Sequence, residues 1–184
     1  TQPDKPTGRQ RVLSPTPVKL YALSKGIPVY DFDKVRGHAE QLKNIGADIM
    51  FTCAYGQLLS QEVLNAFPMG VYNLHASLLP AFRGASPIQS AILGGCEYTG
   101  VTVMKTELAL DCGGILLVKR CKIDGKTCGE LSEELSRLSA EAVVEAARLL
   151  KSGQTQLLLQ DEAAATFCKK ITKDDAKVSF EADA

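Results

Sequence analysis

Segments typical of β-strands alternate with segments typical of helices along this chain, and that alternation limits the folds open to it. Apolar runs predict strands at residues 48–54, 71–75, 101–104 and 115–118, and the first run is suited to a strand buried on both faces. The clearest helix is expected at residues 129–151, where leucine and alanine recur at steps of three and four. This order favours an α/β fold with a mostly parallel sheet flanked by helices.

Capping residues and glycines mark the ends of the shorter helices. Thr16 stands before Pro17, a residue suited to the first helical position, and Gly26 is a natural stop for that helix. An aspartate cap and a closing glycine predict another helix over residues 33–46. Further helices are expected to begin at Ser60 and at Ser86, and a short strand is expected at residues 29–30.

The composition is that of an ordinary globular domain. Of the 184 residues, 45% are hydrophobic and 23% are charged, which excludes a disordered, collagen-like or coiled-coil chain. Basic and acidic residues number 21 each, so the chain has no overall field to attract nucleic acid. No apolar run approaches the roughly 18 residues of a membrane-spanning helix, so we expect no membrane partner.

Cysteine and histidine usage argues against a metal site. The six cysteines include no Cys-x-x-Cys pair, and the chain has two histidines. We therefore expect no zinc or other metal. Scattered cysteines in a chain of this length favour free thiols in a reducing compartment.

The residues best suited to chemistry follow the predicted strand at 71–75. Asn73 and His75 are two residues apart, so on a strand their side chains point to the same face. Asp111 is the one acid among residues 108–116, in a glycine-containing loop that could bring a carboxylate to the imidazole. Taken singly, each has a simpler interpretation as a polar pair at a strand end or a turn-capping aspartate. The combination and its order carry the functional hypothesis.

Three segments together resemble the family of formyltransferases that use 10-formyltetrahydrofolate. They are residues 73–88 (NLHASLLPAFRGASPI), 99–104 (TGVTVM) and 110–116 (LDCGGIL). Asp111 and Gly113 match the family pattern, whereas Cys112 and Gly114 depart from its commonest residues. The resemblance implies a Rossmann-like formyltransferase fold.

Two further segments are similar to the members of this family that formylate initiator methionyl-tRNA. They are residues 1–9 (TQPDKPTGR), similar to a loop that reaches the tRNA acceptor end, and 170–178 (KITKDDAKV), similar to an interdomain link. The implied partners are 10-formyltetrahydrofolate as co-substrate and the initiator methionyl-tRNA, with no metal required.

The resemblance also implies roles for individual residues. The implied catalytic set is Asn73, His75 and Asp111; the implied folate contacts are Ser77, Leu78, Leu79 and Pro80, with Tyr55 and Gly56 at the rim; Arg9 is implied to face the tRNA acceptor stem. In this chemistry a free amine attacks the formyl carbon, and an amide such as that of Asn73 can donate to the developing oxyanion. His75 can donate to the same oxygen or accept the amine proton, while Asp111 orients the imidazole or a relay water.

The family comparison further implies a domain plan. Residues 1–165 are expected to be the catalytic domain without its first strand–helix–strand unit, and residues 166–184 a linker toward an absent C-terminal tRNA-binding domain. The expected state is a monomer in the bacterial cytoplasm, or in the mitochondrial or plastid matrix of a eukaryote.

Other readings stay open. A formyltransferase that acts on an amino-sugar nucleotide is the nearest alternative, followed by one that acts on glycinamide ribonucleotide. A hydrolase could use His75 and Asp111 with Ser77 or Ser86, but the Gly-x-Ser-x-Gly elbow is missing from the sequence. A non-catalytic fragment of a formyltransferase is the third class of answer.

Overall fold

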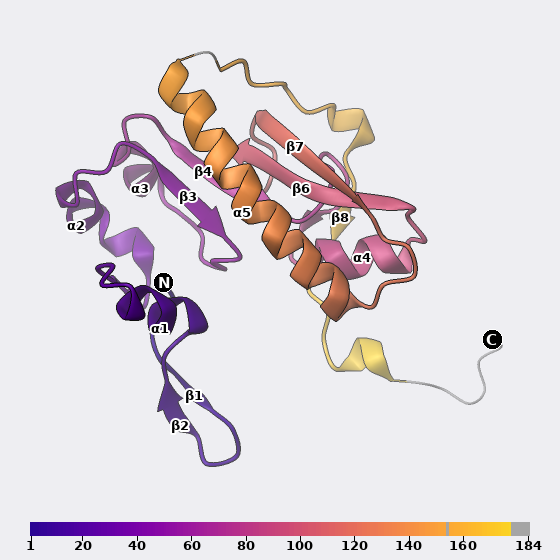
Figure 1. Ribbon diagram of the computed structural model, residues 1–184, viewed down its shortest axis with the longest axis horizontal. Coiled ribbons are helices and arrows are strands. Elements are labelled where there is room, and N and C mark those ends of the chain that lie inside the picture. Colours follow the sequence, from indigo (N-terminus) through magenta and orange to yellow (C-terminus); the bar gives the residue numbers. More distant parts are fainter. Residues whose placement is uncertain (154, 178–184) are drawn as a thin grey trace. The chain divides into compact units, whose positions relative to one another are not determined.

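The computed structural model describes residues 1–153 and 155–177 and divides the chain into two compact units (Figure 1). The first unit is Thr1–Gly70 and the second is Val71–Ala184. Among the helices of the described residues, none is long and apolar enough to cross a membrane.

The first unit begins with an exposed hairpin and continues with short helices around one strand. Its elements are β1 (Lys5–Thr7), β2 (Val12–Ser14), α1 (Pro17–Ser24), the 3-10 helix η1 (Val35–Gly37), α2 (Ala39–Asn44), β3 (Met50–Cys53) and α3 (Gln61–Asn65). β1 and β2 pair antiparallel. The Thr16 hydroxyl accepts a hydrogen bond from the Lys19 N–H, which confirms the predicted cap of α1.

Three predictions for this unit are wrong in detail. The helix expected over residues 33–46 is divided at His38, whose φ of −124° belongs to neither η1 nor α2. At the start of η1 the Gln57 side chain accepts from the Val35 N–H and donates to the Phe32 carbonyl, which fixes where that helix begins. Residues 29–30 form no strand, and the residues of β3 are half-buried or exposed instead of buried on both faces.

The second unit holds the main sheet. Its elements are β4 (Val71–His75), β5 (Arg83–Gly84), α4 (Pro87–Leu93), β6 (Tyr98–Lys105), β7 (Ile115–Lys122), α5 (Cys128–Ser152), η2 (Glu162–Ala164), β8 (Phe167–Cys168) and η3 (Asp174–Ala176). β6 pairs antiparallel with β4 and with β7, while β5 and β8 form a separate parallel pair. The predicted strands at 71–75, 101–104 and 115–118 are confirmed.

The expected mostly parallel sheet is not what this unit contains. Parallel neighbours need a long crossover connection, usually a helix, to bring the chain back to the same end of the sheet. The connection from β6 to β7 contains no helix, and β6 runs back along β4 after α4. The fold is α/β with mixed pairing.

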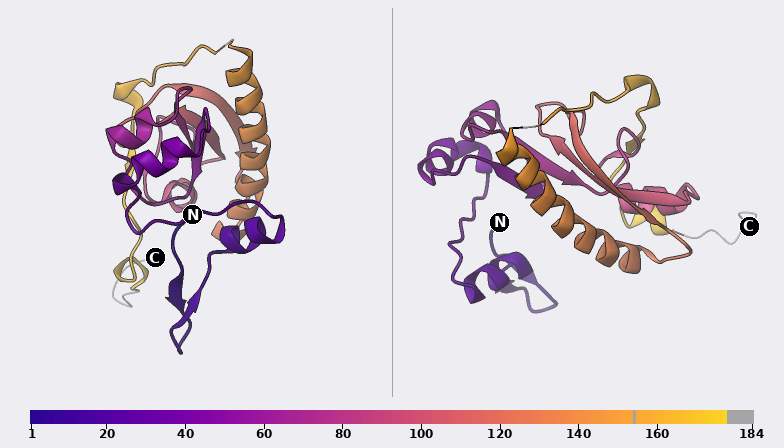
Figure 2. Two further views of the ribbon diagram at one scale, coloured as in Figure 1. Left: turned by 90° about the vertical axis from the view of Figure 1, so that its left-hand side faces the viewer. Right: turned by 45° about the horizontal axis from the view of Figure 1, so that its top comes forward.

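Helix α5 supplies one side of the core. Its buried residues recur at helical spacing and are Leu131, Leu135, Ala142, Ala146 and Leu150. A capping box between Thr127 and Glu130 begins the helix, and Gly153, at φ 70°, ends it. Figure 2 shows α5 along one side of β6 and β7, with the chain after α5 returning past the other side.

Truncation of the buried face of α5 should destabilise the protein. We expect Leu135→Ala, at a side chain 2% exposed, to lower the free energy of unfolding by about 2–5 kcal/mol, because it leaves a cavity against the sheet. Val144→Ala on the same helix, at a side chain 50% exposed, should change it by less than about 0.5 kcal/mol. Denaturant unfolding of both variants measures the difference, and equal losses would contradict this account of the core.

Candidate active site

The site is built around His75, the last residue of β4. The β4–β6 register places Asn73 opposite Met104 and His75 opposite Thr102. Asn73 is half-buried and lies two residues before His75, so both side chains share one face of the strand. His75 is 5% exposed, so its ring is enclosed by neighbouring residues of the second unit.

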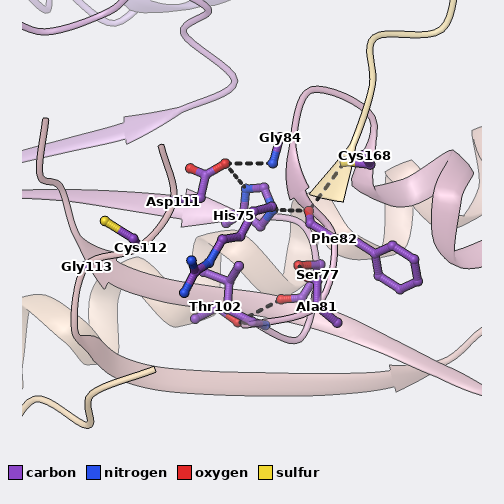
Figure 3. Close-up of polar contacts among 12 residues, drawn as sticks. His75, Ser77, Ala81, Phe82, Gly84, Thr102, Asp111, Cys112, Gly113 and Cys168 are labelled. Atoms are coloured by element: carbon purple, nitrogen blue, oxygen red, sulfur yellow. Dashed lines mark hydrogen bonds and ion pairs between the residues drawn. The ribbon is translucent and has the colours of Figure 1, made fainter. Parts of the chain in front are cut away.

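The two ring nitrogens of His75 have different neighbours (Figure 3). Nε2 lies 2.9 Å from the backbone oxygen of Phe82. Because a carbonyl oxygen can only accept, Nε2 is the nitrogen that carries a proton in both ring states. Nδ1 faces Asp111, with 3.6 Å between Nδ1 and Oδ2. The nitrogen that gains or loses a proton is therefore the one beside the carboxylate.

Asp111 lies in the loop between β6 and β7, and a backbone N–H holds its carboxylate. Its Oδ2 accepts a hydrogen bond of 2.9 Å from the Gly84 N–H (Figure 3). Its φ is 49°, in the left-handed region that costs a non-glycine residue about 1–3 kcal/mol. At 3.6 Å the contact with His75 is too long for a hydrogen bond, so it acts as an ion pair when the ring is protonated.

The loop after β4 is folded tightly onto β6. The Ser77 hydroxyl donates to the Ala81 carbonyl at 2.6 Å, and the Leu79–Pro80 peptide is cis. The Thr102 hydroxyl donates to the Ser77 carbonyl at 2.7 Å and accepts from the Leu79 N–H at 3.2 Å. Thr102 is fully buried, and it ties the loop to the sheet.

The four residues of this loop that the resemblance assigns to folate differ in exposure. Ser77 is fully buried with its hydroxyl engaged, and Leu79 is 7% exposed in a core cluster with Met104 and Ile115. Leu78 and Pro80 are half-buried. The apolar surface that the loop offers to a ligand therefore comes from Leu78 and Pro80.

The other predicted site residues belong to the first unit. Tyr55 lines a cavity of about 600 Å³ there, and Gly56 has a φ of 72°. Burial raises the pKa of the Tyr55 phenol. Arg9 is exposed in the turn between β1 and β2. The structure brings His75 and Asp111 together in the second unit, whereas Tyr55, Gly56 and Arg9 are positioned by the fold of the first.

Three residues of the site region had no role assigned from the sequence. Thr102 and Arg83 lie in segments whose resemblance was noted, but no spacing rule singled them out. Gln160 carried no signal, because its contacts with Asp111 and Gly113 join positions more than 45 residues apart. Within the described residues, no group of three or more His, Cys, Asp or Glu side chains is arranged to hold a metal ion.

Comparison with known proteins gives consistent matches. The sequence model of the family "Formyl transferase" matches residues 1–147. A methionyl-tRNA formyltransferase of Lachnospira eligens is 43% identical over 183 residues, covering 98% of this chain and 58% of that protein. The chain thus spans less than two thirds of the length of the curated relatives it matches.

Solved structures show the same fold. Glycinamide ribonucleotide transformylase 1 of Symbiobacterium toebii superposes with a TM-score of 0.68 at 26% identity, covering 76% of this chain and 73% of that one. HypX of Aquifex aeolicus, solved in complex with tetrahydrofolic acid, gives a TM-score of 0.73 at 17% identity, covering 89% of this chain and 29% of that one. The latter supports the fold alone.

The role of Thr102 can be tested by removing its hydroxyl. Thr102→Val keeps the shape but leaves the Leu79 N–H and the Ser77 carbonyl without this partner, so we expect a loss of about 1–3 kcal/mol in unfolding free energy. Thr102→Ser keeps the hydroxyl and should retain most of that stability. Thermal and denaturant unfolding of the two variants provide the measurement, and a valine variant as stable as the serine variant would refute the assignment.

Proposed function

This chain belongs to the formyl transferase family, and we propose that its protein transfers the formyl group of 10-formyltetrahydrofolate to the α-amino group of methionine on initiator methionyl-tRNA. The observation that carries the proposal is the contact of Asp111 with His75, which lies on β4 two residues after Asn73. The similarity to methionyl-tRNA formyltransferases along nearly the whole chain supports this choice of acceptor.

The reaction places negative charge on the formyl oxygen when the amine attacks the formyl carbon. The Asn73 amide can donate to that oxygen, a contribution of about 3 kcal/mol for such a donor. Asn73 is suited to this because β4 holds it on the face that His75 also occupies.

His75 handles the proton through one nitrogen. Nε2 is engaged by the Phe82 carbonyl, so Nδ1 is the atom that can accept the amine proton or donate to the formyl oxygen. Asp111 Oδ2, 3.6 Å away, stabilises the positive ring that results when Nδ1 is protonated. The same carboxylate accepts from Gly84, which keeps it in place while the ring changes charge.

Substrate roles are proposed for residues of each unit separately. In the second unit, Leu78 and Pro80 offer an apolar wall to the flat ring of the folate. In the first unit, we assign Tyr55 and Gly56 to the folate as rim residues, on the strength of the family resemblance. Arg9, exposed in the β1–β2 turn, would contact a phosphate of the acceptor stem. This contact adds affinity without reading sequence.

The domain plan remains part of the proposal. Residues 1–165 would form the catalytic domain, and residues 166–184 would lead toward a tRNA-binding domain. Residues 166–168, at the start of that linker, are hydrogen bonded to the loop at 80–85. Residues 178–184 lie outside the described residues.

Substitution of the proposed catalytic residues tests the chemistry. We expect Asn73→Ala and Asp111→Asn each to lower the rate of formyl transfer by about 100-fold, because each removes charge stabilisation from the reacting centre. Asp124→Asn is a matched control, since Asp124 also has a positive φ, 46°, but is exposed and lies between β7 and α5. Its rate should stay within about twofold of the unmodified protein.

The assay should also decide the acceptor. The complete gene product is incubated with 10-formyltetrahydrofolate carrying a labelled formyl group. Three acceptors are supplied: methionyl initiator tRNA, glycinamide ribonucleotide and a nucleotide-linked amino sugar. We expect label on the tRNA. Label on either other acceptor would retain the chemistry and replace the substrate, and near-normal rates in both catalytic variants would remove the residue assignment.

A further inference from the structure

A buried arginine joins the loop of the site to the segment that follows α5. We call residues 157–168 the strap. Arg83, in β5, has a side chain 3% exposed, and its Nε and Nη2 donate to Gln160 Oε1 at 3.0 and 2.8 Å. Its Nη1 and Nη2 also donate to the two oxygens of Glu162, at 2.9 and 2.7 Å. The guanidinium therefore holds two side chains of the strap at once.

The arginine dictates which way the Gln160 amide points. Its Oε1 accepts two hydrogen bonds from a cation, so the amide nitrogen must lie on the opposite side. That nitrogen donates to the Asp111 carbonyl at 2.9 Å and to the Gly113 carbonyl at 2.8 Å. A flipped amide would set its N–H groups against the guanidinium and its oxygen against two carbonyls.

These two hydrogen bonds from Gln160 contact the strained loop that contains Asp111. Asp111 has a φ of 49°, and Gln160 holds its carbonyl together with that of Gly113, two residues further along the chain. The turn aims the Asp111 carboxylate at Gly84 and at His75 Nδ1. Without the two hydrogen bonds from Gln160, we expect the Asp111 backbone to relax toward negative φ and its carboxylate to move away from His75 Nδ1.

The strap holds the partners of His75 as well. Thr166 accepts from the N–H groups of Phe82 and Arg83, and Cys168 accepts from the Ala85 N–H through its carbonyl. Phe82 presents its carbonyl to His75 Nε2, and Gly84 presents its N–H to Asp111. The strap therefore contacts the backbone on both sides of the imidazole.

We propose that Gln160, oriented by Arg83, is a positioning residue for the formyl transfer, holding the Asp111 turn so that the carboxylate stays on His75 Nδ1. This inference rests on the proposed function for its effect on rate. Its structural content concerns the position of Asp111 relative to His75.

The first test is Gln160→Met, which keeps the length of the side chain and removes its polar atoms. We expect kcat to fall about 10- to 100-fold, as for other residues that orient a catalytic group. KM for 10-formyltetrahydrofolate and for the tRNA should stay within about twofold, since Gln160 touches neither proposed substrate surface. Gln156→Met, the same change at an exposed strap-side glutamine, is the matched control and should leave kcat unchanged.

A double-mutant cycle separates positioning from general damage. If Gln160 acts through the Asp111 carboxylate, Gln160→Met should cost little in a protein that already carries Asp111→Asn. Losses that multiply in the double variant would overturn the proposal. Gln160→Glu serves as a second variant, because it keeps an acceptor for Arg83 while setting an oxygen against the two carbonyls, and it should also lower kcat.

A spectroscopic readout makes the test independent of activity. The chain has two histidines, so His38→Gln identifies the ring signals of His75 in an NMR spectrum. Gln160→Met should shift the His75 ring nitrogen signals, and Gln156→Met should not. Unchanged His75 signals with unchanged kcat would overturn the proposal. If no acceptor is formylated by the unmodified protein, the proposed function fails and the His75 signals alone decide the positioning role.

Discussion

The antiparallel register of β4 on β6 is the constraint on which the site depends. It sets His75 opposite Thr102, and the Thr102 hydroxyl then ties down the loop that contains Ser77 and Leu79. A slip of one residue would turn every side chain of β4 to the other face. Asn73 and His75 would leave the site together, and the loop would lose its tie. The geometry of the proposed site and the packing of the loop are therefore specified by one strand pairing.

Close backbone contacts then bring the remaining pieces to His75. A Cβ on Gly113 would lie 1.8 Å from the Lys105 carbonyl oxygen, and one on Gly84 would lie 2.3 Å from the Cys168 carbonyl oxygen. Gly84 also has a φ of 122°, which side chains rarely allow. These two glycines let the Asp111 turn and the loop at 80–85 approach their neighbours closely enough for the hydrogen bond from Gly84 to Asp111.

Local patterns predicted the elements well and the tertiary arrangement less well. The strand at 71–75 and the helix at 129–151 follow from apolar runs and helical periodicity. These patterns reflect burial of one face of an element, whatever its neighbour is. The start of η1 is held by the distant side chain of Gln57, and the direction of β6 depends on its pairing with β4 and β7, so neither is visible in a local window. His75 and Asp111 could be paired from motif and order, whereas Gln160 gains its role only from contacts across 49 residues.

The interposition of a neutral amide between Arg83 and Asp111 has a physical rationale. A guanidinium bonded directly to the Asp111 carboxylate would compete with His75 for it, because charge-assisted bidentate pairs are the stronger contacts. Here the cation is balanced by Glu162, whose carboxyl pKa is lowered by the hydrogen bonds from Arg83. Gln160 is oriented by that ion pair and donates to the carbonyls of Asp111 and Gly113. The Asp111 carboxylate is left to contact Gly84 and the imidazole. The Asp111 backbone is thus held by Gln160, while its carboxylate stays free to face the imidazole, as the proposed proton transfer at Nδ1 requires.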